Sequence, residues 1–278
     1  MKLLVLGNPI KHSKSPEIQN YWLKKNNISE KYEKVEITVN QIDEYINKIK
    51  TNQLIGFNVT VPFKEKFYKK IKHHEKSALN TKAVNTVYKK DNKVFGANTD
   101  GVGFTNSLKL DCKLNLKKKN VLIVGAGGAS RGICFEIIKH KIQCLTIMNR
   151  TPLNLMRLVK DLRKEDIKCK ILIKDWSDRV ISEETNVVVN TTSLGLKKQD
   201  TLEFDFSKAN TKCLIYDLIY NPKETHFLKQ AKKYNLTTSN GLGMLCRQAA
   251  ESFNMWFGIK ISETQITEIL NKLKGSKI

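Results

Sequence analysis

The 278-residue sequence contains no apolar run long enough to cross a membrane. A membrane-spanning helix needs roughly 20 apolar residues in succession, whereas the opening run from Leu3 to Leu6 ends at Gly7. That run is also too short for the core of a signal peptide. We therefore expect a cytoplasmic protein with no membrane partner.

Clustered cysteines are also missing, because the six cysteines are scattered between Cys112 and Cys246 without a C-x-x-C pair. Disulfide frameworks and metal sites need grouped or regularly spaced ligands. We expect no metal centre, and we expect thiols that act as small hydrophobic side chains in a reducing compartment.

Arginine and acidic residues are scarce. Only six of the 49 basic residues are arginine, and with 27 acidic residues the formal net charge is +22. A basic chain can bind nucleic acid by neutralising phosphates, but these lysines spread from Lys2 to Lys277 instead of forming one basic arm. The pattern favours solvated surface lysines, and we predict no nucleic-acid partner. The charge would still attract anionic ligands over long range.

The chain is long enough for two domains of ordinary size. In the first hundred residues, helices are expected from Ser15-Pro16 and over 41–50, since serine before proline is typical of a helix N-cap. Residues 89–92 favour a hairpin turn. Strands are expected at 2–7, 35–39, 54–61, 84–88 and 94–97. This order predicts a mixed α/β domain.

From Asn120 onward, strands and helices alternate. The expected strands are 120–124, 143–148, 169–173, 186–190 and 213–217. This alternation predicts a Rossmann-type, doubly wound parallel sheet. Two further helices, at about 243–257 and 262–274, are expected to return to the first domain. The predicted domains are therefore 1–101 plus 242–278, and 102–241.

The segment VLIVGAGGASRG (121–132) is a strand that ends in glycines and opens a helix. Such glycines allow a tight turn and let backbone N–H groups approach a pyrophosphate, which the helix N-terminus stabilises. We predict a dinucleotide site here, and not a plain strand–helix turn. Its residues are Gly125, Ala126, Gly127, Gly128 and Ala129.

The second strand of this domain has no acidic residue at its end. An NAD enzyme usually places Asp or Glu there to hold the ribose hydroxyls, but residues 140–151 contain neither and end in Asn149, Arg150 and Thr151. An arginine can pair with a 2′-phosphate that a carboxylate would repel. The sequence thus favours NADP(H), with these three residues as further cofactor ligands.

Four segments carry polar groups that the fold alone does not require. They are GNPIKHSKSP (7–16), FNVTVPFKE (57–65), AVNT with ANTDGVGF (83–86 and 97–104), and NGLGMLCRQAA (240–250). Together with GAGGASR and NRT they occur in the order and at the spacings of shikimate dehydrogenases, over about residues 3–257. The chain resembles that family, and the resemblance implies NADPH-dependent reduction of 3-dehydroshikimate to shikimate in aromatic amino-acid biosynthesis.

The resemblance also implies residue roles. Ser13 and Ser15 would hold the substrate carboxylate, since hydrogen bonds to a charged group contribute about 1.5–3 kcal/mol each; Ser15 is also expected to cap its helix. Further substrate ligands would be Asn58, Thr60, Asn85, Tyr220 and Gln248. Near the nicotinamide would lie Leu218 and Gly241, with residues 190–193 lining the cofactor cleft. The first domain would bind substrate and the second NADP.

Lys64 and Asp100 are the predicted catalytic residues and are also counted among the substrate ligands. Reduction of a carbonyl places negative charge on its oxygen, which a positioned ammonium can stabilise and protonate. In a lysine-rich chain most lysines are solvated, so it is the place of Lys64 in NVTVPFK that singles it out. Asp100 would favour the charged form of the lysine, or only cap the following helix, or do both.

Some positions depart from the family pattern. Asn154 stands where a basic residue is common, so Arg157 would have to substitute or the NADP preference would be looser. Lys76 and Lys82 replace an acidic residue and a glycine, which leaves the local loop geometry open. Two alternatives remain: an NAD-using quinate/shikimate dehydrogenase, and a non-catalytic NADP-binding regulatory protein. The chain is expected to be a monomer or a homodimer.

Overall fold

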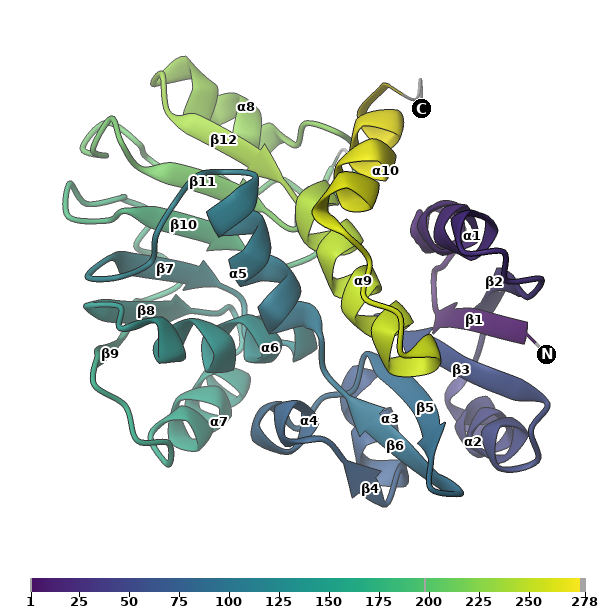
Figure 1. The fold of residues 1–278 in the computed structure, drawn as a ribbon. Helices are drawn as coiled ribbons and strands as arrows, with labels where there is room; N and C mark the ends of the chain where they lie inside the picture. Colours follow the sequence, from purple (N-terminus) through teal and green to yellow (C-terminus); the bar gives the residue numbers. More distant parts are fainter. Residues whose placement is uncertain (1, 198, 276–278) are drawn as a thin grey trace. The chain divides into compact units, whose positions relative to one another are not determined.

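The computed structural model describes residues 2–197 and 199–275 (Figure 1). The chain divides into two compact units. The first runs from the N-terminus to Phe104 and resumes at Leu245, and the second spans Thr105–Met244. Both boundaries fall within helices, α5 (Asp100–Leu110) and α9 (Leu242–Phe257).

The first unit contains a mixed six-stranded sheet of order β2-β1-β3-β5-β6-β4. Its strands are β1 (Lys2–Gly7), β2 (Lys31–Glu36), β3 (Leu54–Val59), β4 (His73–His74), β5 (Thr86–Lys90) and β6 (Lys93–Ala97). β1 lies parallel to β2 and β3, whereas β5 runs antiparallel to β3 and β6. The mixed α/β prediction is confirmed, although the strand expected at 35–39 ends at Glu36.

The β5–β6 hairpin confirms the predicted turn. Asp91 and Asn92 have φ angles of 48° and 57°. A two-residue hairpin turn with positive φ at both positions matches the twist of the flanking strands, and Asn and Asp tolerate that conformation.

Helices cover both faces of this sheet. On one face, Phe57, Val59 and Val87 pack in a single apolar core with Ile46 and Phe67. The helices of this unit are α1 (Ser15–Lys25), η1 (Val39–Gln41), α2 (Ile42–Lys50), α3 (Lys64–Lys70), α4 (Lys76–Thr81), the major part of α9, and α10 (Glu263–Gly275).

The C-terminal helices return to the first unit, as expected (Figure 1). Trp22 of α1 meets Phe253 of α9 edge to face, with ring centroids 6.1 Å apart. The indole of Trp256 donates to the Val87 carbonyl at 3.1 Å. Alternate residues of a strand point to opposite faces, so Gly56 and Asn58 flank the core residue Phe57 and face α9.

The second unit contains a six-stranded parallel sheet of order β12-β11-β10-β7-β8-β9. The strands are β7 (Asn120–Val124), β8 (Cys144–Met148), β9 (Lys170–Ile173), β10 (Val187–Asn190), β11 (Leu214–Asp217) and β12 (Thr237–Asn240). The helices are the greater part of α5 (105–110), α6 (Gly128–Ile137), η2 (Ile138–His140), α7 (Pro152–Leu162) and α8 (His226–Lys233). This is the Rossmann strand order, with the switch point between β7 and β10.

Asp217 is a buried carboxylate at the end of β11 that organises the neighbouring chain ends. Its side chain accepts hydrogen bonds from the Asn190 amide (3.0 Å), the Ile219 N–H (3.0 Å) and the Thr225 hydroxyl (2.7 Å). Thr225 in turn accepts from the Leu228 N–H as the N-cap of α8. Burial without a cation raises the pKa of Asp217 to about 6, against the opposing effect of these hydrogen bonds.

Within the described part of the chain, no helix is both long and apolar enough to cross a bilayer. Cys134, Cys213 and Cys246 are buried, and the other three cysteines are half-buried. Burial raises the pKa of Cys134 and of Cys213 to about 12, so these two thiols stay protonated at neutral pH.

Gly56→Ala should destabilise the protein by about 1–3 kcal/mol, the usual cost of overpacking a tight site. A Cβ at this position would lie 2.1 Å from the Trp256 Nε1 atom and 2.7 Å from the Val87 carbonyl oxygen. The measurement is the melting temperature, with Gly275→Ala as control because a Cβ there meets nothing within 4 Å. An unchanged melting temperature for Gly56→Ala would contradict the packing described.

Asp217→Asn should change how stability depends on pH. A carboxyl group whose pKa is higher in the folded state contributes stability that decreases as pH rises from about 4 through about 6. The amide keeps an oxygen for Asn190 and Ile219 but removes this titration. Between pH 5 and 7.5, the free energy of unfolding of the variant should improve by about 1–2 kcal/mol relative to wild type.

Unfolding followed at several pH values measures this difference. Asp166→Asn, which removes an exposed carboxylate from the same unit, is the control. A constant difference between Asp217→Asn and wild type across that range would show that Asp217 does not titrate as described.

Candidate active site

The structure brings the two predicted catalytic side chains together. Lys64 is the first residue of α3 and Asp100 is the first residue of α5. The Lys64 Nζ atom lies 2.5 Å from Asp100 Oδ2, and their side chains are 13% and 5% exposed. The Val84 N–H donates to the Lys64 carbonyl at 3.0 Å, which ties the start of α3 to the entry of β5. The pair therefore joins segments 36 positions apart.

Asn85 holds the other oxygen of Asp100. Its Nδ2 group donates to Asp100 Oδ1 at 2.9 Å and to Gln248 Oε1 at 3.2 Å. The Thr99 N–H donates to Asn85 Oδ1 at 2.9 Å, and the Thr99 hydroxyl also bonds Asn85 and Gln248. Three predicted substrate ligands, Asn85, Asp100 and Gln248, thus form one hydrogen-bonded cluster. Thr99 was not predicted as part of it, although it stands beside Asp100 in the ANTDGVGF segment.

Asn58 lies deeper in the same cluster and is 5% exposed. Its oxygen accepts from the Tyr32 hydroxyl at 2.7 Å. Its Nδ2 group donates to the Asn85 carbonyl, the Thr86 hydroxyl and the Ser252 hydroxyl. The amide is therefore satisfied within the protein, and a role as substrate ligand stays a prediction.

Thr60 lies where β1 and β3 end, and Ser13 and Ser15 lie together at the start of α1. The Thr60 N–H donates to the Leu6 carbonyl, and a Cβ on Gly7 would lie 2.4 Å from the Thr60 methyl group. The prediction that Ser15 caps α1 is wrong. Ser15 is the first helical residue, its side chain makes no cap hydrogen bond, and its N–H instead donates to Ser13 Oγ at 3.3 Å.

The loop before Asn85 has a lysine, at position 82, in a conformation that glycine favours. Lys82 ends α4 in the left-handed conformation, with φ 52° and ψ 33°. A glycine adopts this conformation without strain, whereas a lysine is held there by the surrounding structure. The loop geometry that the sequence left open is therefore of the kind that glycine would allow.

The arrangement in the first unit suits proton transfer. A nearly buried ammonium and carboxylate are held at hydrogen-bond distance, and a third group fixes the carboxylate. Removing one partner of such a pair leaves an uncompensated buried charge and costs about 3–5 kcal/mol. Tyr220 belongs to the second unit, where it is half-buried beyond β11, and its role stays a prediction.

The glycine loop of the second unit has the geometry that a pyrophosphate requires. Gly125 has φ +119°, and a Cβ there would lie 2.4 Å from the Thr191 hydroxyl. Gly127 stands at the N-cap of α6 with no side-chain cap, and a Cβ on it would meet nothing within 4 Å. Open space therefore adjoins the free N–H groups of a helix N-terminus, which favour an anion.

Asn149, Arg150 and Thr151 follow β8, next to the glycine loop. The Gly125 N–H donates to the Met148 carbonyl at 2.8 Å, so the two loops adjoin. Asn149 donates to the Thr151 carbonyl, and Thr151 is the N-cap of α7. Arg150 is exposed, and its guanidinium has no ion pair within residues 2–197 and 199–275. It is available to a phosphate.

The remaining predicted cofactor residues meet at the ends of β10, β11 and β12. A Cβ on Gly241 would lie 1.9 Å from the Leu218 carbonyl oxygen, so only glycine fits. The Leu218 N–H donates to the Asn190 carbonyl at 3.0 Å. Asn190 itself is fully buried and bonds Asp217 and Leu194, so its side chain cannot line a cleft. That role is left to residues 191–193.

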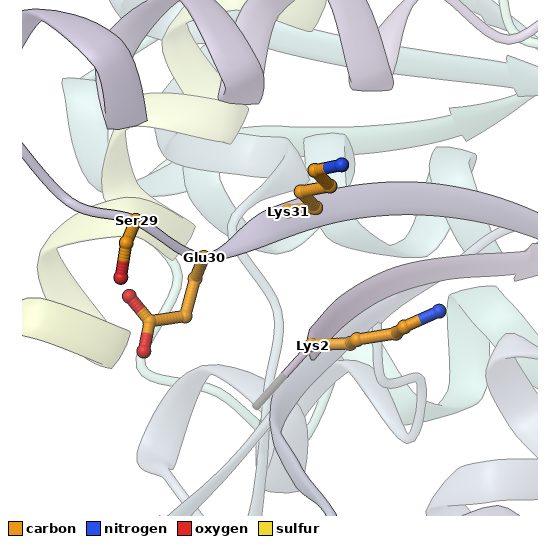
Figure 2. A pocket seen from close by; sticks show the side chains of 4 residues that line it. All are labelled: Lys2, Ser29, Glu30 and Lys31. Carbon is orange, nitrogen blue, oxygen red and sulfur yellow. The ribbon is translucent and has the colours of Figure 1, made fainter.

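A shallow pocket of about 440 Å³ lies at the other end of the first sheet, at the start of β1 and β2 (Figure 2). Its residues are Lys2, Ser29, Glu30 and Lys31. Figure 2 shows the two ammonium groups pointing away from the Glu30 carboxylate. No predicted site residue lines this pocket. Among the described residues, no group of three or more His, Cys, Asp or Glu could hold a metal ion.

Three family models match the chain in series. Residues 5–87 match the shikimate dehydrogenase substrate binding domain, 108–235 match shikimate / quinate 5-dehydrogenase, and 241–270 match the shikimate 5′-dehydrogenase C-terminal domain. The first match contains Lys64 and Asn85, and the second contains the glycine loop.

Individual relatives cover nearly the whole chain. The shikimate dehydrogenase (NADP(+)) of Pelagibacter ubique is 40% identical over 92% of this chain and 93% of its own length. The shikimate 5-dehydrogenase of Thermus thermophilus, solved with NADP(H) and shikimate, has a TM-score of 0.85 and 27% identity, covering 98% of this chain and 99% of its own. The enzyme of Listeria monocytogenes, solved with shikimate and NAD, has a TM-score of 0.86 and 27% identity, covering 97% and 96%.

Because the family models match in the order of the chain and relatives above 30% identity span nearly all of it, this chain belongs to the shikimate dehydrogenase family.

Proposed function

We propose that this protein is an NADP-dependent shikimate dehydrogenase that reversibly reduces 3-dehydroshikimate to shikimate. The observation that carries the proposal is the Lys64–Asp100 pair, 2.5 Å apart and largely buried, with Asn85 bonded to the second carboxylate oxygen. These groups belong to a chain whose relatives are named shikimate dehydrogenase (NADP(+)). The nearly complete burial of an ion pair argues against a non-catalytic protein, since it is costly to maintain for stability alone.

In the reducing direction, Lys64 would donate a proton from Nζ to the ketone oxygen as negative charge develops on it. The neutral amine then regains a proton from solvent. In the oxidising direction, the neutral amine takes the hydroxyl proton. Asp100 keeps Nζ in place and stabilises the ammonium in both directions.

The substrate would be oriented by neutral hydrogen-bonding groups. Ser13 and Ser15 lie together at the start of α1 and suit its carboxylate. Thr60, Asn85 and Gln248 suit the carboxylate or the ring hydroxyls. Ser15 supports this assignment best, because its side chain is buried yet is not used as a helix cap.

The second unit would hold the cofactor. When bound, NADPH supplies the hydride. Residues 125–129 would bind its pyrophosphate, Arg150 with Asn149 and Thr151 its 2′-phosphate, and Leu218 and Gly241 its nicotinamide end. The open space at Gly127 supports this assignment, as does the exposed Arg150 guanidinium, which has no ion pair in the described part of the chain.

We assign substrate binding and catalysis to residues 1–101 plus 242–278, and NADP binding to 102–241. We further propose that the enzyme is cytoplasmic and acts as a monomer or a homodimer. The boundaries of the two compact units lie near those of the proposed domains and support the division.

Lys64→Ala should lower kcat by about 10²–10⁴-fold, the usual contribution of a general acid or base. Affinity for shikimate, measured by calorimetry, should stay close to wild type because other groups bind the substrate. Lys66→Ala, an exposed lysine on the same helix, is the control. Near-normal turnover of a folded Lys64→Ala protein would remove Lys64 from the mechanism.

NADP⁺ reduction should be rapid with shikimate, slow with quinate, and much slower when NAD⁺ replaces NADP⁺. Arg150→Ala should raise the KM for NADP⁺ by about 10- to 100-fold, because a charge-assisted hydrogen bond contributes about 1.5–3 kcal/mol. The KM of the Arg150→Ala variant for NAD⁺ should not change. Arg163 is another exposed arginine of the second unit, and Arg163→Ala serves as control. A wild-type preference for NAD⁺ would contradict the cofactor assignment and favour the quinate/shikimate alternative.

A further inference from the structure

A second layer of buried hydroxyl groups lies behind Asn85. We call Tyr32, Thr86 and Ser252 the hydroxyl layer. Thr86 and Ser252 are fully buried and Tyr32 is 2% exposed, so none of them can touch a substrate. They come from three distant parts of the sequence: β2, β5 and α9.

The hydroxyl layer is bonded directly to the candidate active site. The Thr86 hydroxyl donates to Asn85 Oδ1 at 2.9 Å and lies 2.7 Å from the Ser252 hydroxyl. Asn58 Nδ2 donates to both hydroxyls, at 3.2 and 2.9 Å. Ser252 also donates to the Gln248 carbonyl at 3.1 Å, one turn earlier on α9. Thr86 and Asn58 are register partners on neighbouring strands, which places both side chains on the face toward α9.

The orientation of the Asn85 side-chain amide decides whether its NH₂ group or its oxygen faces the Asp100 carboxylate. The Thr99 N–H can only donate, and it bonds Asn85 Oδ1, so Nδ2 must face Asp100 Oδ1. The opposite orientation would place an amide oxygen against the carboxylate. The Thr86 hydroxyl donates to the same Asn85 oxygen and therefore stabilises the orientation that holds Asp100.

The hydroxyl layer is not connected to solvent in the way that a proton pathway requires. It ends at Tyr32, whose hydroxyl donates to Asn58 Oδ1 and is enclosed. Burial raises the pKa of Tyr32 well above its usual value, so this phenol stays protonated. A chain with no opening to solvent can hold groups in place but cannot deliver protons.

We propose that Thr86 and Ser252 are positioning residues of the reaction. Thr86 fixes the Asn85 amide directly, and Ser252 supports it through Thr86 and Asn58. The amide then holds Asp100 Oδ1, which leaves Oδ2 to hold the Lys64 ammonium. The inference rests on the function proposed above. Its consequence is kinetic, because a misplacement of about 1 Å at a reacting group can cost about 100-fold in rate.

Thr86→Val and Thr86→Ser form the test pair. Valine keeps the shape of threonine and removes the hydroxyl, whereas serine keeps the hydroxyl and removes a methyl group. We expect Thr86→Val to lower kcat by about 10-fold with little change in the KM for shikimate. Thr86→Ser should restore most of kcat. Thr146→Val, on strand β8 of the second unit, is the control and should keep wild-type kcat.

Ser252→Ala acts on Asn85 indirectly, because the Ser252 hydroxyl contacts Thr86 and Asn58, which both bond Asn85. It covers the case in which Thr86→Val fails to fold. It should lower kcat in the same direction, and the double variant should lose less than the product of the two single effects because the residues act as a unit. Melting temperatures separate loss of fold from loss of rate.

Three outcomes would overturn the proposal. Wild-type kcat in folded Thr86→Val and Ser252→Ala would remove the hydroxyls from the mechanism. Equal losses in Thr86→Ser and Thr86→Val would assign the effect to packing. Absence of shikimate turnover in the wild-type protein would overturn the proposed function and this inference with it, whereas wild-type turnover with unaffected variants would overturn the inference alone.

Discussion

The buried ion pair between Lys64 and Asp100 is the interaction on which the first unit is organised. Two charges removed from water are stable only when they are close and their remaining hydrogen-bonding capacity is used. Here one carboxylate oxygen faces the ammonium and the other faces Asn85. The surrounding amides and hydroxyls have their donors and acceptors matched, so the cluster is held in one arrangement. Such a preorganised site can respond to charge on a substrate without rearranging.

The second unit contains a buried carboxylate that is compensated in a different way. Asp217 is as buried as Asp100, but among the described residues its carboxylate is paired with neutral donors, from Asn190, Ile219 and Thr225, and not with a cation. Neutral donors compensate a charge only in part, which is why burial raises the pKa of Asp217 to about 6. In return, one side chain fixes the ends of β10 and β11 and the start of α8. The carboxyl ends of these parallel strands are where a dinucleotide binds in this fold.

The fold could be predicted from the sequence at the positions where the local chemistry of the residues determines the backbone conformation. Positive φ at Asp91 and Asn92, and the glycines after β7, follow from what those residues tolerate. β12 was not predicted because its sequence, Thr237–Asn240, has no apolar residue, and it forms only as the edge of an existing sheet. Ser15 was assigned as a cap because serine before proline suits that role, but Ser13 takes the available N–H.

The site was predicted through motifs, since spacing alone does not show that residues 36 positions apart will meet. Motifs also do not identify supporting groups. Thr86 stands in the AVNT motif beside Asn85 but received no role, and Ser252 lies beyond the last motif, where only the packing of α9 brings it to the Thr86 hydroxyl. Lys82, which stands where the family pattern has glycine, shows that a motif position can change while its conformation is allowed. A residue that disfavours the left-handed conformation can still be held in it by its surroundings.

A crystal structure of the protein with shikimate and NADP⁺ tests the central claim most directly. We expect the Lys64 ammonium to lie within about 3 Å of the hydroxyl oxygen on the ring carbon that is oxidised, with Asp100 still bonded to Lys64. Shikimate bound with that oxygen away from Lys64, or with Lys64 separated from Asp100, would contradict it.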